Sequence, residues 1–202
     1  LPALGFTLFE KCKNSDLKFG IDGLVPKNIC QYFIEFYEKN NQYAISESSY
    51  KYQTKKNEED NYKCINLSQC SLQNDMFLKP LELAKTYINI MITNYVLHIK
   101  TNICPTFNRY LIGNSLNIRI LKYDTGQFIK DHTDVGSLTR ASCTLNLNEN
   151  YTGGQFRFFD GKIKHSFKTG DAIIFPADPI WIHGTEPITK GTRYSINCFL
   201  NQ

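Results

Sequence analysis

The stretch Tyr123-Asp-Thr-Gly-Gln-Phe-Ile-Lys-Asp-His-Thr-Asp134 decides how this sequence is interpreted. It ends in the tripeptide His132-Thr-Asp134, and a second histidine, His183, follows on a later segment. Two imidazoles and one carboxylate form the facial arrangement that binds non-haem Fe(II) and leaves coordination positions open. The same three residues would also suit zinc, with water as the fourth ligand. The sequence therefore predicts a metal site at His132, Asp134 and His183.

The two halves of this site are expected to come from different strands. Residues two apart in a strand point to the same side, so His132 and Asp134 are predicted to project together into the mouth of a barrel. His183 follows the stretch Phe175–Ile182 and is predicted to arrive from a separate strand region. The alternative is that the histidines are unrelated surface or core residues, because a single short motif is often a chance match.

The last predicted strand, Arg193–Leu200, has an apolar side and a more polar side. The more polar side carries Arg193, Ser195, Asn197 and Phe199. This side is expected to line an interior cavity, where an unpaired charge is very unfavourable. A carboxylate suits Arg193, because a guanidinium can donate two parallel hydrogen bonds to it. The partner is either a protein carboxylate or a small dicarboxylate that also reaches the metal, and Ser195 could add a hydroxyl to the same contact.

Length and composition indicate one globular domain. The chain has 202 residues, of which 42% are hydrophobic and 21% are charged, and this is enough to bury a sizeable core. A net charge of +4 is too small to indicate nucleic-acid binding by itself. No segment has the uninterrupted apolar length that a membrane span needs.

The seven cysteines include no Cys-x-x-Cys pair, so neither a zinc knuckle nor a redox motif is indicated. Cys143 and Cys198 fall in apolar strands and are predicted to be buried thiols. Cys64 and Cys70 flank a polar stretch and could pair in an oxidising compartment. A cytoplasmic location is favoured, and the secretory pathway stays open because the chain begins at Leu1, without an initiator Met.

The first half of the chain carries two helical patterns. Apolar residues recur at helical spacing over Lys27–Asn40 and over Pro80–Lys100, so both segments are predicted to be amphipathic helices. Residues 40–75 are mostly polar and are predicted to form a solvated loop with a short strand near Cys64–Leu67. The alternative is a lid that closes over a substrate, because long loops often serve this purpose.

From residue 111 onward the pattern changes to short strands separated by turns. They are predicted at Leu116–Tyr123, Ser142–Asn148, Gln155–Phe159, Lys162–Phe167, Ala172–Phe175 and Arg193–Leu200. Asp160-Gly161 predicts a tight hairpin between two of them. Such strands indicate a jelly roll, also called a double-stranded β-helix, rather than a parallel α/β sheet. We therefore predict a single, mainly β domain over 1–202, with helical support and a candidate lid in 1–110 and the jelly-roll core in 111–202.

Several motifs together resemble the Fe(II)- and 2-oxoglutarate-dependent dioxygenases, most closely the prolyl 4-hydroxylase and lysyl hydroxylase group. Tyr123-x-x-Gly-Gln, followed by His132-x-Asp134, resembles the metal-binding strand of that group. The other matching segments are Leu145–Gly154 with its double glycine, Gly170–Phe175 and His183–Tyr194. The resemblance is strong over 115–202 and faint before it.

By this resemblance, His132, Asp134 and His183 would be the catalytic ligands of Fe(II), and Arg193 would hold the distal carboxylate of 2-oxoglutarate. Tyr123 would hydrogen-bond the cosubstrate, which would chelate the iron and leave a position for O2. Oxidative decarboxylation of 2-oxoglutarate to succinate would drive hydroxylation of the substrate. Ascorbate is an additional candidate cofactor.

Three positions depart from the patterns of related groups. Asn146 stands where many relatives have a tyrosine, so the contacts to the cosubstrate are expected to differ in detail. Collagen prolyl hydroxylases typically have lysine at the position of Arg193, whereas lysyl and oxygen-sensing prolyl hydroxylases have arginine. Phe199 stands where nucleic-acid demethylases usually have a second arginine, and this counts against base repair.

The resemblance implies a peptidyl hydroxylase, with a prolyl substrate preferred to a lysyl one. The partner would be a peptide or protein, nucleic acid is disfavoured, and the oligomeric state is not indicated. The alternatives are an oxidative demethylase of nucleic acid or protein and a cupin-like module that binds a metal without turnover. Arg140 and Trp181 are candidate substrate residues, with a surface charge and ordinary core packing as their alternative roles.

Overall fold

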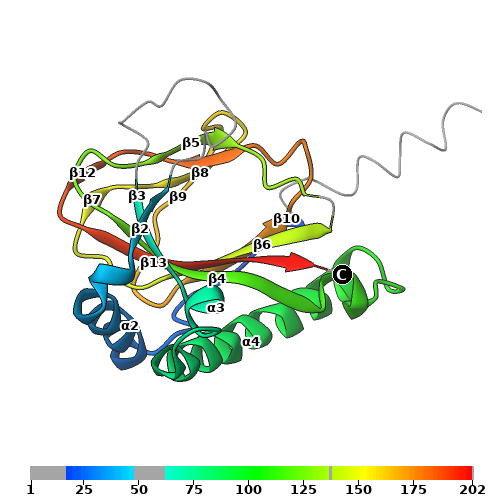
Figure 1. The fold of residues 1–202 in the computed structure, drawn as a ribbon. Helices are drawn as coiled ribbons and strands as arrows, with labels where there is room; N and C mark the ends of the chain where they lie inside the picture. Colours follow the sequence, from blue (N-terminus) through cyan, green and yellow to red (C-terminus); the bar gives the residue numbers. More distant parts are fainter. Residues whose placement is uncertain (1–16, 48–61, 137, 202) are drawn as a thin grey trace, which may run out of the picture.

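Two antiparallel β-sheets lie face to face in the computed structural model, which describes residues 17–47, 62–136 and 138–201 (Figure 1). The larger sheet has the strand order β1-β10-β6-β13-β4-β3-β2. Its strands are Phe19–Ile21 (β1), Ala172–Pro176 (β10), Thr139–Asn146 (β6), Arg193–Asn201 (β13), Asn114–Tyr123 (β4), Tyr62–Asn66 (β3) and Ile45–Glu47 (β2).

The smaller sheet covers the opposite side of the molecule from the helices and has the order β5-β11-β8-β9. Its strands are Ile129–His132 (β5), His183–Thr185 (β11), Phe156–Phe158 (β8) and Ile163–His165 (β9). A separate pair, β7 (Thr152–Gly153) with β12 (Ile188–Lys190), lies beside it. The predicted jelly roll with a helical buttress is confirmed.

The helices cover the outer face of the larger sheet (Figure 1). They are α2 (Lys27–Lys39), α3 (Leu67–Cys70) and α4 (Leu78–Asn102), with 3-10 turns η2 (Asn41–Tyr43), η4 (Asp75–Phe77) and η5 (Arg109–Ile112). The two predicted amphipathic helices are confirmed as α2 and α4. Pro80 lies in the first turn of α4, where its missing N–H removes no helical hydrogen bond.

The main core lies between these helices and the larger sheet. Ile88, Met91 and Ile92 of α4 pack in one cluster with Ile120 of β4 and Ile196 of β13. Each fully buried aliphatic side chain of this kind contributes about 1.5–3 kcal/mol through removal from water. Because side chains alternate along a strand, the neighbouring residues of β4 and β13 turn toward the smaller sheet instead. Those inward residues form one wall of the functional site.

The hairpin predicted at Asp160-Gly161 is confirmed. β8 and β9 pair antiparallel, with Phe158 opposite Ile163. The turn between them has positive φ at Phe159, Asp160 and Gly161. Aspartate and glycine tolerate this left-handed conformation, which explains why the pair signals a turn in the sequence.

The prediction of a solvated loop over 40–75 is wrong for much of that segment. β2 pairs with β3, and β3 pairs with β4 inside the larger sheet. Tyr62, Cys64 and Ile65 are buried, but this apolar run is too short to stand out in a polar segment. The predicted short strand near Cys64–Leu67 corresponds to β3. The middle of the candidate lid, 48–61, lies outside the described residues.

Residues before 111 contribute strands as well as helices to the domain. β1, β2 and β3 all belong to the larger sheet, so the sheet draws on both halves of the chain. Within the described ranges, no helix is long and apolar enough to cross a membrane.

No disulfide joins the cysteines that the structure describes. Cys143 and Cys198 are buried, as predicted, and they are opposite one another on β6 and β13. Cys64 is also buried, and Cys70 is partly exposed. The two residues that an oxidising compartment could have joined, Cys64 and Cys70, do not form a disulfide here.

Candidate active site

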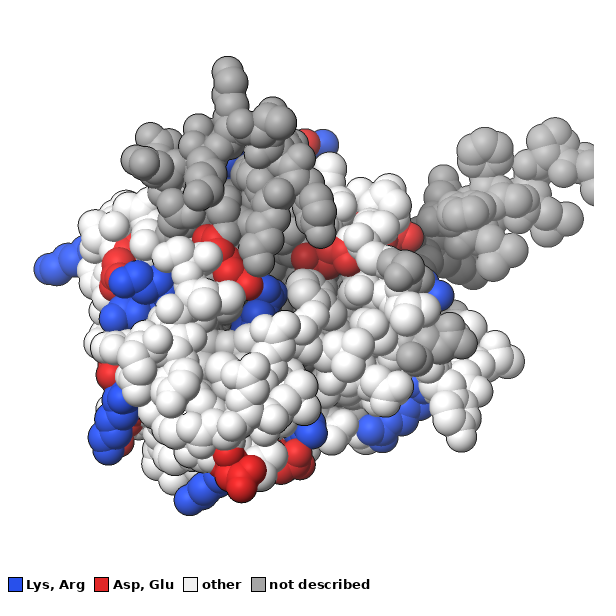
Figure 2. All heavy atoms as spheres, in the orientation of Figure 1, with Lys and Arg blue, Asp and Glu red and all other residues white. Residues whose placement is uncertain are grey.

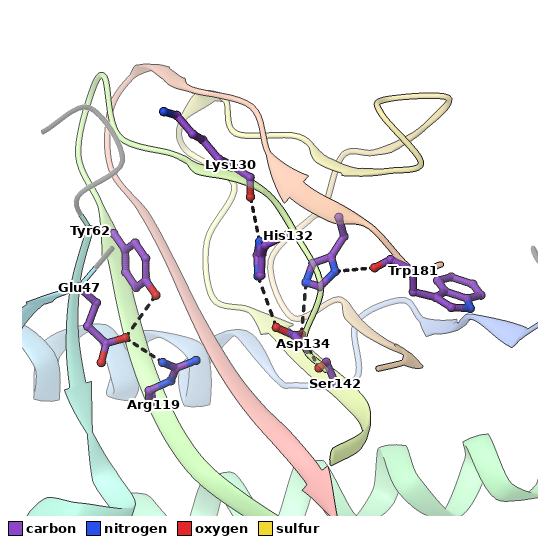
Figure 3. Close-up of polar contacts among 9 residues, drawn as sticks. Glu47, Tyr62, Arg119, Lys130, His132, Asp134, Ser142 and Trp181 are labelled. Atoms are coloured by element: carbon purple, nitrogen blue, oxygen red, sulfur yellow. Dashed lines mark hydrogen bonds and ion pairs between the residues drawn. The ribbon is translucent and has the colours of Figure 1, made fainter. Parts of the chain in front are cut away.

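The three predicted metal ligands come together between the two sheets. β5 and β11 are antiparallel neighbours, and His132 and His183 are opposite one another in their register. Asp134 lies two residues after the end of β5, and its carboxylate oxygens lie 3.4 Å from His132 Nε2 and 3.2 Å from His183 Nε2. All three ligand atoms lie within 4.8 Å of one another. The close-up shows His132 and Asp134 pointing toward each other (Figure 3).

Backbone carbonyls fix the orientation of both imidazoles. His132 Nδ1 lies 2.8 Å from the carbonyl oxygen of Lys130, and His183 Nδ1 lies 2.9 Å from that of Trp181 (Figure 3). A carbonyl only accepts, so each Nδ1 carries a proton. Both Nε2 atoms face the Asp134 carboxylate: an Nε2 that carries a proton donates to it, and an Nε2 without one presents a lone pair to a metal. Three ligand atoms therefore converge on one point, which is the arrangement that a metal cation requires.

Asp134 is charged in this setting. Its side chain is buried, and burial by itself would raise the pKa of the carboxyl group. Hydrogen bonds from His132 and His183 and their charge outweigh this effect and hold the pKa well below its usual range. The hydroxyl of Ser142 donates to Asp134 Oδ2 at 2.5 Å and fixes the rotamer of the carboxylate. The role of Ser142 was not predicted from the sequence, in which it is simply a polar residue inside an apolar strand.

Gly184 allows β5 and β11 to approach closely. A Cβ atom at this position would lie 2.7 Å from the carbonyl oxygen of Ile129 and 2.7 Å from Oδ1 of Asp131. Real Cβ atoms do not come this near to other heavy atoms, so any larger residue would push the strands apart. The glycine after His183 therefore keeps the two histidines within reach of one metal ion.

An aromatic cluster holds His183 from behind. Its ring is stacked on Phe156 at 5.6 Å and lies edge-on to Phe175 at 4.7 Å between centroids. Trp181 is buried in the same cluster, with 1% of its surface exposed. The indole of Trp181 is not among the residues that line the cavity, and its contribution to the site is the backbone carbonyl that binds His183 Nδ1.

A cavity of about 280 Å³ opens in front of the metal ligands, between the two sheets. One wall is the inward side of β13, and it carries Arg193, Ser195, Asn197 and Phe199. This is the side that strand alternation predicted. The inward residues of β4, among them Tyr123, form the adjacent wall, and Arg193 and Tyr123 are opposite one another in the register of the two strands.

Arg193 is the deepest charge in this cavity, with 1% of its surface exposed. Its Nε donates to Asn146 Oδ1 at 3.2 Å, and its guanidinium carbon lies 5.5 Å from the ring centre of Tyr123. Among the described residues, no carboxylate forms an ion pair with it. A buried guanidinium with only a neutral hydrogen-bond partner is unfavourable, so the geometry favours an anion bound in the cavity rather than a protein carboxylate. Ser195, two residues on, faces the same space.

Asn146 anchors Arg193 rather than lining the cavity. Its side-chain amide donates to the carbonyl oxygens of Asn148 at 2.6 Å and Lys168 at 3.1 Å. Its Oδ1 accepts from Arg193 and, at 3.3 Å, from the hydroxyl of Tyr151. With every polar atom of its side chain engaged, Asn146 has a positioning role. This position is one of the three departures noted in the sequence.

A second polar cluster lines the same cavity. Nη1 of Arg119 is 2.8 Å from Oε2 of Glu47, and the hydroxyl of Tyr62 donates to the same oxygen at 3.2 Å (Figure 3). These residues come from β4, β2 and β3, and all three line the cavity. These three cavity residues could not be recognised from the sequence. The one available sign is that Arg119 lies four residues before Tyr123 and therefore on the same side of β4.

Arg140, the other candidate substrate residue, is exposed on β6. It is not among the residues that line the cavity. Its place fits the alternative role of a surface charge, and its part in substrate binding stays a prediction without a contact to support it.

Comparison with known proteins supports the same assignment. Residues 118–201 match the sequence profile of the 2OG-Fe(II) oxygenase superfamily. A PKHD-type hydroxylase of Methylobacterium nodulans is 34% identical over 110 residues, which are 45% of this chain and 46% of the relative. The alignment thus spans less than half of that relative. The predicted resemblance is confirmed.

The fold is shared with solved prolyl hydroxylases. A Trichoplax adhaerens prolyl hydroxylase, solved with a hypoxia inducible factor peptide, has a TM-score of 0.68 at 14% identity, over 93% of this chain and 84% of that one. A Pseudomonas putida prolyl-4-hydroxylase has a TM-score of 0.62 at 17% identity, over 97% and 100%. A viral collagen prolyl hydroxylase of Paramecium Bursaria Chlorella virus-1, solved with 2OG, has a TM-score of 0.57 at 16% identity, over 91% and 94%.

Proposed function

We propose that this protein, whose residues 118–201 match the profile of the 2OG-Fe(II) oxygenase superfamily, is an Fe(II)- and 2-oxoglutarate-dependent hydroxylase of prolyl residues in a peptide or protein. One observation carries the proposal. The ligand set His132, Asp134 and His183 shares a cavity with Arg193, a buried guanidinium that has no carboxylate partner among the described residues. A metal site and an anion site are thus combined in one enclosed space.

The residues present fit both cofactors. Two histidines and one carboxylate are the ligand set typical of non-haem Fe(II), although zinc could use the same atoms. Arg193 fits the distal carboxylate of 2-oxoglutarate, because it offers a planar pair of donors at the closed end of the cavity. When bound, iron and 2-oxoglutarate supply the oxidation: 2-oxoglutarate and O2 give succinate and CO2, and the second oxygen atom is inserted into a C–H bond of the substrate.

The chain itself binds, orients and excludes water. Ser142 holds the Asp134 carboxylate, and the carbonyls of Lys130 and Trp181 hold the two imidazoles, so the ligands are preorganised for the metal. Arg193 and Ser195 would bind the distal carboxylate of the cosubstrate, with Tyr123 alongside. Apolar side chains complete the lining of the cavity and keep bulk water from the reacting groups; they are Leu121, Ile129, Phe156 and Phe175.

A prolyl substrate fits the cavity better than a lysyl one. Phe199 offers an apolar wall for a pyrrolidine ring. A lysyl ammonium would need a carboxylate, and the described carboxylates of the lining are Asp134, which faces the metal site, and Glu47, which is already paired with Arg119. Ascorbate remains an additional reductant to be tested.

A nucleic-acid substrate has less support. On the face seen in Figure 2, lysine and arginine are interspersed with aspartate and glutamate and do not form one broad basic surface. Phe199 occupies the position at which the resemblance would place a second arginine in nucleic-acid demethylases. Both observations favour a peptide substrate over a nucleic acid with its negatively charged sugar-phosphate backbone.

Mass spectrometry on a panel of proline- and lysine-containing peptides tests this function. With Fe(II), 2-oxoglutarate and O2, a prolyl peptide should gain one oxygen atom while succinate forms in equal amount. His132→Ala and Asp134→Ala should abolish both products, and Lys100→Gln, at an exposed position of α4, should retain them as a surface control. Full turnover in either ligand variant would remove the site from the mechanism. Succinate without oxygen gain on any peptide would redirect the search to other substrates.

A further inference from the structure

The cavity has a second polar end that the cofactors do not account for. Along β13, Asn197 follows Arg193 by four residues, and along β4, Arg119 precedes Tyr123 by four residues. Four residues of strand span about 13 Å. Asn197 and Arg119 are opposite one another in the register of the two strands, as Arg193 and Tyr123 are. The pair at this end therefore lies well beyond the carboxylate that Arg193 would hold.

Arg119 is held rigidly and its charge is neutralised in place. Its side chain is 12% exposed, and the 11% exposed carboxylate of Glu47 pairs with it at 2.8 Å. The ring of Phe199 lies against its guanidinium, 5.1 Å from centroid to carbon. With one positive and one negative charge in contact, this end of the cavity offers no net charge to a carboxylate or a phosphate. A neutral, polar ligand group suits it best.

Two hydrogen-bonding atoms at this end have no partner among the described residues. They are Nε of Arg119, which can only donate, and Oδ1 of Asn197, which can only accept. Both atoms are buried, and both residues line the cavity. An unsatisfied buried group of this kind is rare in folded proteins and calls for a reason. One donor beside one acceptor is the complement of a residue in an extended peptide, whose own N–H and C=O point to the same side of the chain.

We propose that Arg119 and Asn197 form an amide-binding subsite that reads the backbone of the residue following the hydroxylated one. Nε of Arg119 donates to the carbonyl of that following residue, and Oδ1 of Asn197 accepts from the N–H of the same residue. Phe199 also lines the cavity and packs on the substrate ring. The subsite selects residues within a peptide chain and rejects the free amino acid, whose carboxylate would meet the Asn197 oxygen. This inference rests on the proposed function.

The test compares a peptide with its ester analogue. The probes are acetyl-Ala-Ala-Pro-Ala-Ala-amide and the same molecule with oxygen in place of the N–H after proline. Binding is measured by calorimetry on the full chain with Fe(II) and 2-oxoglutarate but without O2, so that nothing turns over. The wild-type protein should bind the amide about 10–100-fold more tightly than the ester, because the ester leaves the Asn197 oxygen unpaired.

Matched variants assign this preference to residues. Asn197→Ala should bind both probes with similar affinity. Asn201→Ala is the matched control, because Asn201 is also on β13 and its Oδ1 is also buried without a described partner. This variant should keep the wild-type preference for the amide, because Asn201 does not line the cavity. The double variant Arg119→Met with Glu47→Gln removes the pair without leaving a lone charge. This double variant should bind both probes less tightly and should still bind the amide more tightly than the ester.

Two outcomes would overturn the inference: a wild-type protein that shows no preference for the amide, or an Asn197→Ala variant that retains the full preference. Admission of O2 then separates this inference from the proposed function. A preference for the amide without succinate formation would contradict the oxygenase and support the amide-binding subsite.

Discussion

Replacing Arg193 with methionine should stabilise the ligand-free protein slightly. The guanidinium is 1% exposed, and its hydrogen-bond partner among the described residues is the neutral amide of Asn146. Replacing a buried ion pair with apolar side chains of similar volume has stabilised other proteins by about 1–4 kcal/mol, and a buried charge without an ionic partner is less favourable than a paired one. The aromatic ring of Tyr123 offsets part of this for Arg193, by about 0.5–2 kcal/mol. A net gain of about 1 kcal/mol would raise the melting temperature by about 2–4 °C in a chain of this size.

The same variant should lose its response to 2-oxoglutarate. Two charge-assisted hydrogen bonds to one carboxylate contribute about 3–6 kcal/mol, so the affinity should fall by about 10²–10⁴-fold. At 100 times its dissociation constant, 2-oxoglutarate should stabilise the wild-type protein by about 2.7 kcal/mol. That corresponds to an increase in melting temperature of about 5–11 °C. A site weakened 10²-fold would keep only about 0.4 kcal/mol of this stabilisation, so the variant should show an increase of at most about 2 °C at the same concentration.

Circular dichroism melting curves, recorded without O2 and with Fe(II), measure both effects in one experiment. Arg140→Met is the control, because Arg140 is exposed on β6 and should affect neither value. An Arg193→Met protein that 2-oxoglutarate still stabilises by several degrees would show that the cosubstrate carboxylate binds elsewhere. A large loss of stability in the ligand-free variant would refute the argument that the guanidinium lacks an anionic partner.

Three further predictions concern the supporting residues. Ser142→Ala removes the hydroxyl that donates to Asp134 and should weaken Fe(II) binding about 10–100-fold, as measured by metal titration; unchanged affinity would contradict its orienting role. Gly184→Ala should separate β5 from β11 and lower bound metal below one equivalent, whereas full occupancy would show that the strands can adjust. Burial, and to a smaller extent the charge of Lys18, lower the pKa of His165 from 6.5. As the pH drops below 6.5, the imidazole is therefore protonated in the unfolded state before it is protonated in the folded state. The free energy of unfolding should fall over this pH range. His165→Gln should flatten this part of the pH–melting curve, and an unchanged slope would assign it to other groups.

The metal ligands and Arg193 could be predicted from the sequence because their signals are local. His132 and Asp134 are two residues apart, and the period of two along the last strand put Arg193 on the cavity side. The structure agrees with this alternation, since Ile196 faces the helices while Asn197 lines the cavity. Local spacing was sufficient wherever one strand determined the direction of a side chain.

The second end of the cavity could not be predicted, because it depends on the register between strands. Arg119 contacts Glu47 because β2, β3 and β4 are neighbours in the larger sheet. This could not be foreseen, because β2 belongs to a segment whose polar composition suggested a loop. Trp181 illustrates another limit. Its sequence position beside His183 suggested a side chain in the cavity, but the described contact to the histidine is made by its backbone carbonyl. Residue identity carries no information about such a main-chain role.

The most direct test of the account follows both oxygen atoms of O2. With heavy-isotope O2, Fe(II) and 2-oxoglutarate, a hydroxylated prolyl peptide and succinate should each carry one labelled atom, in equal amounts, and Asp134→Ala should form neither product. Mass spectrometry of both products gives the answer in one reaction. Hydroxylation without label in succinate, or equal turnover in Asp134→Ala, would contradict an oxygenase centred on His132, Asp134 and His183.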